Sequence, residues 1–189
     1  HNGSRGLGDV YKRQEFDKYY PDLVIVQGDT STAFSAALAA FYRNIPVAHV
    51  EAGLRTSNKI NPFPEELNRR MITQIADLHF APTKLASDNL KKEGIHKNVY
   101  ITGNTVIDSL LKIASSVEPP KITNMDWGNK KIILVTVHRR ENWGRNLEEI
   151  TFAIKDLAKK RKEVHFIIPM HKNKIVRDKI ITELSGISN

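Results

Sequence analysis

The chain has 189 residues, of which 40% are hydrophobic and 26% are charged, and its formal net charge is +8. This composition is typical of a soluble globular protein and supplies enough apolar material for a sizeable core. The lack of cysteine excludes disulfide bonds, thiolate metal sites and a cysteine nucleophile, and it fits a cytoplasmic location. No apolar run approaches the roughly 20 residues that a membrane span requires.

The two ends of the chain differ from its interior. Residues 1–14, HNGSRGLGDVYKRQ, are glycine-rich and aperiodic, and we interpret them as a non-native leader. The other end stops soon after a helical pattern, where an α/β domain would normally continue into another strand. We therefore expect a fragment that is truncated at both ends and is inactive on its own.

Short apolar runs alternate with helix-period stretches over residues 15–116, which indicates an N-terminal Rossmann-like domain with parallel strands. The predicted strands cover residues 22–27, 46–50, 78–81 and 99–102. The predicted helices cover residues 31–43, 83–94 and 105–115, together with one that begins at Pro64 and buries Leu67, Met71 and Ile75. The long irregular stretch from Glu51 to Phe63 is typical of functional or disordered loops.

A change of composition divides the chain. Residues 117–129 contain Pro119-Pro120 and show no periodicity, so we interpret them as a linker between domains. The pattern then restarts, and residues 130–189 are expected to form the first part of a C-terminal Rossmann-like domain. Its predicted elements are strands at 131–137 and 164–169 and helices at 146–162 and 173–184. In the first of these helices, four side chains are expected to face the core, namely Leu147, Ile150, Ile154 and Leu157.

The positive charge is spread along the chain. Basic residues do not alternate with aromatic side chains, so they indicate a solvated surface rather than a nucleic-acid interface. A basic balance is also compatible with an anionic small-molecule ligand.

Polar side chains follow four of the predicted strands, namely Asp29, Glu51, His138 and His171. Ligands of open α/β sheets collect beyond the carboxyl ends of the strands, so these residues are candidates for a binding site. Arg139 follows His138 directly and adds positive charge where a phosphate could bind.

Structural roles are also possible for these acidic residues. Asp29 could cap the helix that follows it. Glu51 follows an apolar strand and needs a partner or solvent, so it could pair with Arg55 or Arg69. Each of these alternatives would remove a carboxylate from the candidate site.

The remaining candidates have comparable alternatives. Glu65 and Glu66 suit the first turn of their helix because carboxylates interact favourably with the helix dipole. His138 could lie on the surface, whereas His49 and His79 are inside strand patterns and are expected in the core. Several carboxylates and an imidazole near strand ends are nevertheless poor for stability and indicate an acid/base site for a charged ligand.

Five segments carry a family resemblance, and they are QGDTSTAFSAALAAFYRNIPVAHVEAGLRT, PFPEELNRR, ITGNTVIDSL, VTVHRRENWG and PMHKN. In this order and spacing they resemble the non-hydrolysing UDP-N-acetylglucosamine 2-epimerases. The resemblance extends from about Pro21 to about Asp178. It implies an α/β fold with two Rossmann-like domains of GT-B type, each with a parallel sheet, and an active site between them.

The resemblance also implies a reaction. The family's catalytic carboxylates match Asp29, Glu51 and Glu65, and its active-site histidine matches His138. The implied reaction interconverts UDP-N-acetylglucosamine and UDP-N-acetylmannosamine by elimination of UDP to 2-acetamidoglucal and by re-addition. Carboxylates would stabilise the cationic intermediate and transfer the proton at C2.

Substrate contacts are implied for Asp29, Glu51, His138 and Arg139. Arg139 and His171 match contacts at a second, regulatory position of the family. The scheme needs no cofactor and no metal, and its partners are the two UDP-sugars, with neither nucleic acid nor membrane. The full-length protein would be a homodimer.

Two other functions remain open from the sequence. A GT-B glycosyltransferase that uses a nucleotide sugar would share the architecture. A hydrolysing epimerase would release free N-acetylmannosamine. A catalytically silent binding protein is a third alternative, and the joint presence of Asp29, Glu51, Glu65 and His138 disfavours it.

Overall fold

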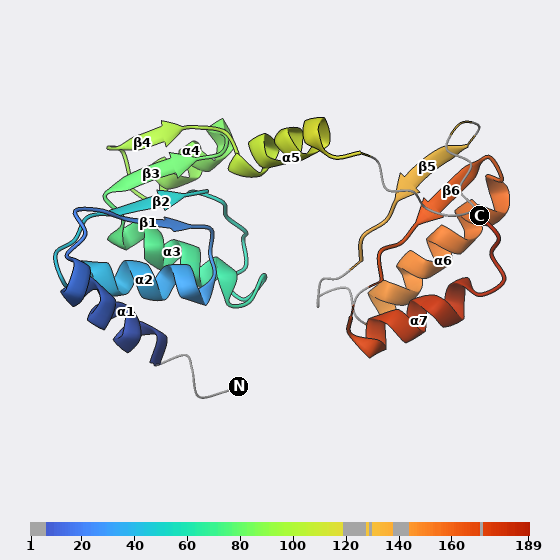
Figure 1. Cartoon of the computed structure of the whole chain (residues 1–189), viewed down its shortest axis with the longest axis horizontal. Helices are drawn as coiled ribbons and strands as arrows, with labels where there is room; N and C mark the ends of the chain where they lie inside the picture. The colour runs from blue at the N-terminus through green and yellow to red at the C-terminus, as the bar shows by residue number, and fades with distance from the viewer. Residues whose placement is uncertain (1–6, 119–127, 129, 138–143, 171) are drawn as a thin grey trace. The chain divides into compact units, whose positions relative to one another are not determined.

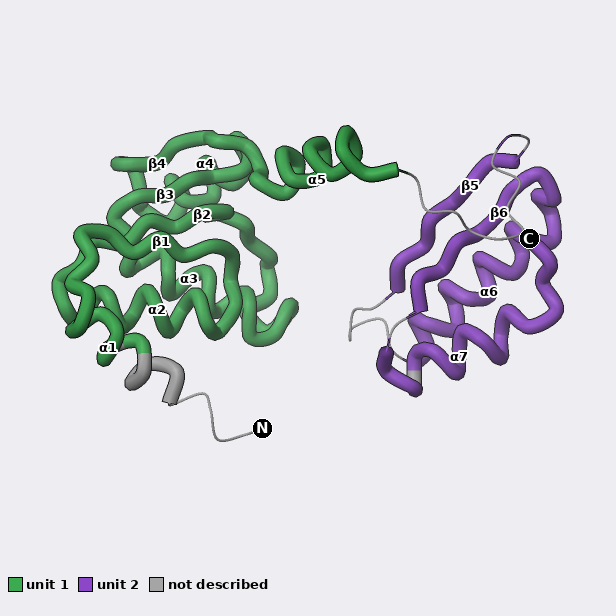
Figure 2. The backbone as a smooth tube through the Cα atoms, in the orientation of Figure 1, with its two compact units in different colours: residues 1–118 green, residues 119–189 purple. Residues whose placement is uncertain are grey.

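A computed structural model describes residues 7–118, 128, 130–137, 144–170 and 172–189 (Figure 1). The chain divides into two compact units, residues 1–118 and 119–189 (Figure 2). The division falls within the stretch predicted as the linker. The predicted strands and helices that lie on described residues are confirmed, with small shifts at their ends. None of the described helices is long and apolar enough to cross a bilayer.

Unit 1 is built on one parallel sheet. Its elements are α1 (Leu7–Tyr19), β1 (Val24–Gln27), α2 (Ser31–Phe41), β2 (Val47–Val50), α3 (Glu65–Ile75), β3 (Leu78–Ala81), α4 (Lys84–Lys92), β4 (Val99–Ile101) and α5 (Thr105–Ser116). The strands lie in the order β1-β2-β3-β4, so each successive crossover moves in the same direction. Right-handed crossovers therefore place the helices that connect the strands on one face of the sheet.

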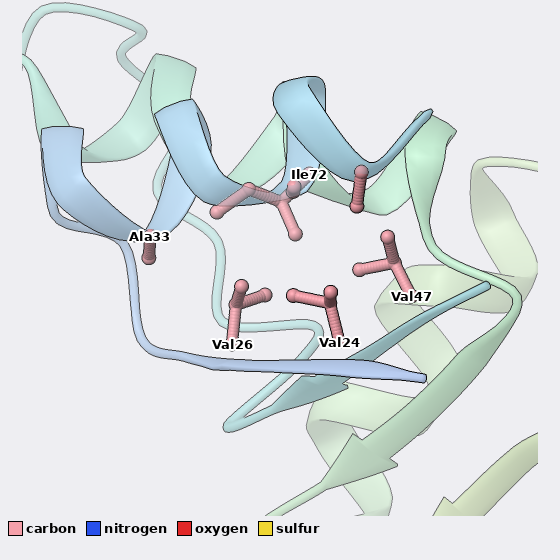
Figure 3. Packing of buried hydrophobic residues seen from close by; sticks show 7 residues of the cluster. Val24, Val26, Ala33, Val47 and Ile72 are labelled. Carbon is pink, nitrogen blue, oxygen red and sulfur yellow. The ribbon is translucent and has the colours of Figure 1, made fainter. Parts of the chain in front are cut away.

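The core of unit 1 lies between β1, β2 and the helices α2 and α3 (Figure 3). Val24 and Val26 project from β1 toward Ala33 of α2 and Ile72 of α3. Helix α2 packs closely because its buried positions are alanines. Ile25 lies on the opposite face of the sheet and is 64% exposed, so the core lies on the helix-covered face.

The N-terminal helix α1 crosses the boundary that the sequence predicts at residue 14. Phe16 packs against the core of unit 1, and Asp17 forms an ion pair with Arg43 at the end of α2. The non-native origin of residues 1–14 stays a prediction.

Helix α3 packs through a different side than the sequence indicates. Leu67 and Met71 were expected in the buried stripe, but both are exposed, whereas Ile72 is fully buried. The buried side also carries Glu66 and Arg69. The prediction was wrong because ion pairs allow charged side chains on this face, and hydrophobic periodicity does not detect them.

Unit 2 contains β5 (Lys131–Leu134), α6 (Arg145–Lys160), β6 (Val164–Ile167) and α7 (Lys174–Leu184), with β5 and β6 paired in parallel. Leu147 and Ile154 of α6 are buried as predicted, and Ile150 packs at the edge of the core. Leu157 was expected inward and is exposed. Ala158 takes the buried position because it completes the helical repeat.

Candidate active site

The carboxyl ends of β1 and β2 bring two of the predicted acidic residues to the same edge of the sheet. Gln27 and Val50 are register partners at the last positions of these strands, and the amide of Gly28 continues the ladder by donating to the Val50 carbonyl at 3.0 Å. Asp29 and Glu51 therefore leave adjacent strands at the same edge. Glu51 Oε2 lies 3.4 Å from the point where a side chain would begin on Gly28.

Glu51 has an unusual backbone conformation. Its φ angle is +68°, a region that non-glycine residues seldom adopt and that costs on the order of 1 kcal/mol. Its carboxylate has no hydrogen bond or ion pair with any residue that the structure describes. The predicted alternative, pairing with Arg55 or Arg69, is wrong, because both guanidinium groups bind other carboxylates. Glu51 is thus held at the strand end without a partner in the described part of the chain.

Asp29 is free of the capping role that was its structural alternative. Thr30 caps α2 instead, since its hydroxyl accepts from the Ala33 amide at 3.1 Å. The Asp29 carbonyl accepts from Asn68 Nδ2 at 2.9 Å, which ties the turn to α3. Arg69 Nη1 lies 3.6 Å from Asp29 Oδ2. The Asp29 carboxylate can therefore interact with a ligand.

Charge and burial set the protonation of Asp29. Burial raises the pKa of this carboxyl above its ordinary value, while the nearby Arg69 charge lowers it. The negative charges of Glu65 and Glu66 raise the pKa further. Glu65 is half-buried at the start of α3. Asp29 thus lies among the charges of α3 and takes up a proton more readily than an ordinary aspartate.

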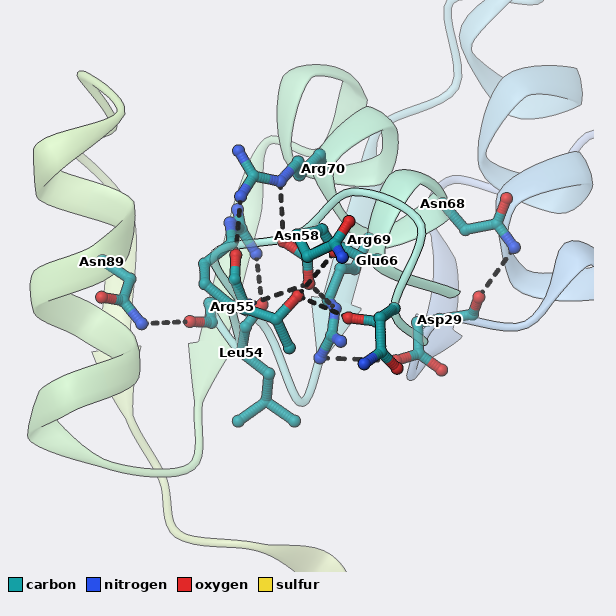
Figure 4. Close-up of polar contacts among 12 residues, drawn as sticks. Asp29, Leu54, Arg55, Asn58, Glu66, Asn68, Arg69, Arg70 and Asn89 are labelled. Carbon is teal, nitrogen blue, oxygen red and sulfur yellow. Dashed lines mark hydrogen bonds and ion pairs between the residues drawn. The ribbon is translucent and has the colours of Figure 1, made fainter. Parts of the chain in front are cut away.

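The burial of Glu66 was not predicted from the sequence. Glu66 was expected to favour the helix dipole, yet its side chain is fully buried, accepts two hydrogen bonds and forms an ion pair with Arg69 (Figure 4). Oε2 accepts from the Thr56 amide at 3.0 Å and lies 2.8 Å from Arg69 Nε. Oε1 accepts from Arg70 Nε at 2.7 Å. The spacings from Glu66 to the two arginines are those of neighbours on a helix, a signal that was available in the sequence.

A second ion pair anchors the irregular segment that follows Glu51. Arg55 binds the Glu93 carboxylate through two bonds, Nε to Oε1 at 2.8 Å and Nη2 to Oε2 at 2.6 Å. The hydrogen bond from Arg55 is the main cause that lowers the pKa of Glu93. Arg55 Nη2 also donates to Thr73 Oγ1 of α3 at 2.9 Å. The segment is therefore tied to two helices.

Close backbone contact adds a third anchor. The Gly53 carbonyl accepts from Asn89 of α4 at 3.0 Å (Figure 4). Gly53 has a φ of +87°, and a side chain there would begin 2.2 Å from the carbonyl oxygen of Ala86. Only glycine fits this position without rearrangement. The backbone beyond Glu51 is thus pressed against α4.

The two predicted core histidines are confirmed as buried, and one of them supports the site. His49 Nε2 lies 2.8 Å from the Gly28 carbonyl oxygen. Burial lowers the pKa of His49 to about 4, and burial also lowers the pKa of His79. The imidazole of His49 is therefore neutral near pH 7, and its Nε2–H donates to the carbonyl that precedes Asp29.

The remaining predicted site residues, His138, Arg139 and His171, lie outside the described residues. Within the described part of the chain, no group of three or more histidine, aspartate or glutamate side chains could hold a metal ion. The described candidate site therefore consists of the unit 1 carboxylates Asp29, Glu51 and Glu65 with the buried network behind them.

Comparisons with known proteins identify the family. A sequence model of the family "UDP-N-acetylglucosamine 2-epimerase" matches residues 10–189. The UDP-N-acetylglucosamine 2-epimerase of Neisseria meningitidis serogroup A is 46% identical over 184 residues, which are 92% of this chain and 49% of that protein. The enzyme of the same name from Bacillus subtilis is 48% identical over 165 residues, or 86% of this chain and 43% of that protein. The chain thus spans about half the length of these relatives.

Solved structures give the same result. The UDP-GlcNAc 2-epimerase from Neisseria meningitidis, bound to UDP-GlcNAc, matches with a TM-score of 0.85 and 40% identity, covering 98% of this chain and 52% of that one. A co-structure of S. aureus MnaA with UDP matches with a TM-score of 0.87 and 42% identity, covering 98% and 50%. The predicted fold class, α/β with parallel sheets of GT-B type, is confirmed. The chain belongs to the UDP-N-acetylglucosamine 2-epimerase family.

Proposed function

We propose that a full-length protein carrying this chain interconverts UDP-N-acetylglucosamine and UDP-N-acetylmannosamine without hydrolysis. The observation that supports the proposal is that Asp29 and Glu51 follow the paired ends of adjacent strands. Glu51 sits in a costly conformation without a described partner, and burial raises the pKa of Asp29. Two carboxylates with different environments suit a reaction in which a proton must be both removed and returned.

The chemistry explains why carboxylates are required. The C2 proton of the sugar is not acidic while C1 carries no positive charge. When the C1–O bond breaks, its electron pair leaves with UDP, and C1 becomes an oxocarbenium ion. A carboxylate then takes the C2 proton, and the C2–H electrons form the C1–C2 double bond of 2-acetamidoglucal. Return of the proton to the opposite face of C2, with attack of UDP on C1, completes the inversion.

The roles of the residues follow from the family resemblance. Asp29, Glu51 and Glu65 would stabilise the cation and move the proton. His138 would stabilise the departing diphosphate with the charge of Arg139. Arg139 and His171 would contact substrate at a regulatory position, and the full-length protein would act as a cytoplasmic homodimer.

The test incubates the purified full-length protein with UDP-N-acetylglucosamine in D2O, without an acceptor, and follows the anomeric signals by NMR. We expect UDP-N-acetylmannosamine to appear with deuterium at C2, because the proton removed exchanges with solvent. Free N-acetylmannosamine as the product would indicate a hydrolysing epimerase instead. A UDP-sugar that stays unchanged until an acceptor is added would indicate a glycosyltransferase. His138→Ala should lower turnover by about a hundredfold or more.

A further inference from the structure

Glu66 is a buried carboxylate whose contacts reach Arg69, the neighbour of Asp29, and the segment that follows Glu51. It lies in the first turn of α3, its side chain is 0% exposed, and both of its oxygens are occupied by donors. A buried ion pair of this kind contributes little net stability, since desolvation offsets the attraction between the charges. We therefore look for the role of Glu66 in the residues that its partners Arg69, Arg70 and Thr56 contact.

The first set of contacts connects Glu66 to Asp29 through Arg69. Arg69 lies 2.8 Å from Glu66 through Nε and 3.6 Å from Asp29 through Nη1 (Figure 4). The guanidinium is thus shared between two carboxylates, and it is closer to Glu66. Arg69 is only 7% exposed, so little solvent competes for its donors. Glu66 keeps Arg69 from pairing fully with Asp29.

The second set of contacts connects Glu66 to the segment that follows Glu51. The Thr56 amide donates to Glu66 Oε2 at 3.0 Å, and Arg70 bridges Glu66 to the Thr56 carbonyl at 3.1 Å. Thr56 lies five residues after Glu51. The segment between them is also held by the hydrogen bonds of Arg55 to Glu93 and of Gly53 to Asn89. The same carboxylate therefore fixes the backbone that follows Glu51.

We propose that Glu66 is a positioning residue that holds Arg69 at a set distance from Asp29 and holds the Thr56 backbone behind Glu51. The proposal rests on the proposed function, because it assigns Glu66 a purpose in that reaction. It differs from a purely structural role in one respect. A structural role predicts lower stability with kcat unchanged, whereas a positioning role predicts a lower kcat together with a change in the titration of Asp29.

The test variant is Glu66→Gln in the full-length protein. The amide oxygen of glutamine can still accept from Thr56, but the negative charge is lost and Arg69 becomes free to pair with Asp29. Among the described residues, the charged groups that act on Asp29 are Arg69, Glu65 and Glu66, all on α3. Removing one anion and releasing the cation both favour the ionised form, so the pKa of Asp29 should fall.

Two readouts follow this change. NMR of protein labelled with 13C at aspartate side-chain carboxyls measures the titration directly, and Asp29→Asn identifies the signal. The acid limb of the kcat–pH profile should move to lower pH by the same amount, with kcat lowered about tenfold and KM nearly unchanged. Glu93→Gln is the matched control, because it removes a carboxylate from Arg55 and Arg70 without touching Arg69.

An unchanged Asp29 titration in Glu66→Gln would overturn the proposal, and so would an equal shift in Glu93→Gln. If Glu66→Gln does not fold, Arg69→Gln provides the test, since loss of the cation should raise the pKa of Asp29. No rise in that variant would likewise overturn it. The NMR titration needs no substrate, so a parent protein without epimerase activity would refute the proposed function and leave this test standing.

Discussion

The buried imidazole of His49 lies 2.8 Å from the carbonyl oxygen of Gly28, at the turn that carries Asp29. The bond requires a proton on Nε2, and burial keeps the ring neutral by lowering the pKa of His49 to about 4. A core histidine thereby supports the backbone of the candidate site. Because it must stay neutral in the folded state, it lowers the free energy of unfolding as the pH falls.

The first expectation concerns acid stability. The unfolded chain protonates His49 near its ordinary pKa of 6.5, whereas the folded chain resists protonation until about pH 4. The unfolded state binds more protons in this window, so the free energy of unfolding should fall as the pH drops from about 7 to about 4 and then level off. The loss is on the order of 3 kcal/mol. Urea unfolding at pH 7.5, 5.5 and 4 measures it.

His49→Gln should flatten this dependence, since glutamine can still donate to the Gly28 carbonyl but does not titrate. A residual slope in the same direction is expected from His79, whose pKa burial also lowers. His96 is exposed, so His96→Gln serves as the control for a histidine-to-glutamine exchange outside the core. An equal slope in the parent and His49→Gln would contradict the assignment.

For Asp29 we expect a pH dependence of the free energy of unfolding that has the opposite sign. Its pKa is raised by burial, so the unfolded chain loses this proton at a lower pH than the folded chain does. The folded state binds more protons in that window, and stability is lost as the pH rises through it. Asp29→Asn should therefore have a higher Tm than the parent at pH 7 and a similar Tm at pH 3. Its turnover should fall by about a hundredfold or more. A lower Tm at pH 7 would show that the charge stabilises the fold.

Glu51 should show a trade-off between stability and activity. Its positive φ is disfavoured for glutamate, whereas asparagine adopts this region more readily. Glu51→Asn should therefore match or exceed the Tm of the parent while losing at least about a hundredfold in turnover. Glu51→Gln separates the two effects, because it removes the charge and retains the strain. Wild-type turnover in either variant would remove Glu51 from the site.

The sequence predicted those features of the site that depend on strand ends. Asp29 and Glu51 follow apolar runs, and parallel strands bring the residues after them to one edge, so their proximity needs no knowledge of packing. The core placement of His49 follows in the same way, because its neighbours in the strand are apolar. Local pattern is sufficient where one element fixes the position.

Features that depend on which helix face is buried were missed. The spacing of Leu67 and Met71 is that of a buried stripe, yet α3 turns Glu66 and Arg69 inward. The choice is made by partners distant in the sequence, such as the Thr56 amide and Asp29, which satisfy the buried charges. A hydrophobic pattern contains no information about such partners, so the helical spacing of Glu66, Arg69 and Arg70 can be read in the sequence but the burial of their network cannot.

The last expectation concerns the contact between Gly53 and the backbone of α4, and it is tested by comparing two matched glycines. Gly53 and Gly94 have nearly equal φ angles, +87° and +86°, but a side chain on Gly94 would meet no atom within 4 Å. Gly94→Ala should therefore cost only the conformational penalty of about 1 kcal/mol. Gly53→Ala adds a clash with the Ala86 backbone and should cost more than about 2 kcal/mol in urea unfolding. Because the clash displaces the segment that Glu51 begins, turnover should fall in Gly53→Ala and not in Gly94→Ala. Equal costs in the two variants would mean that the segment is not pressed against α4.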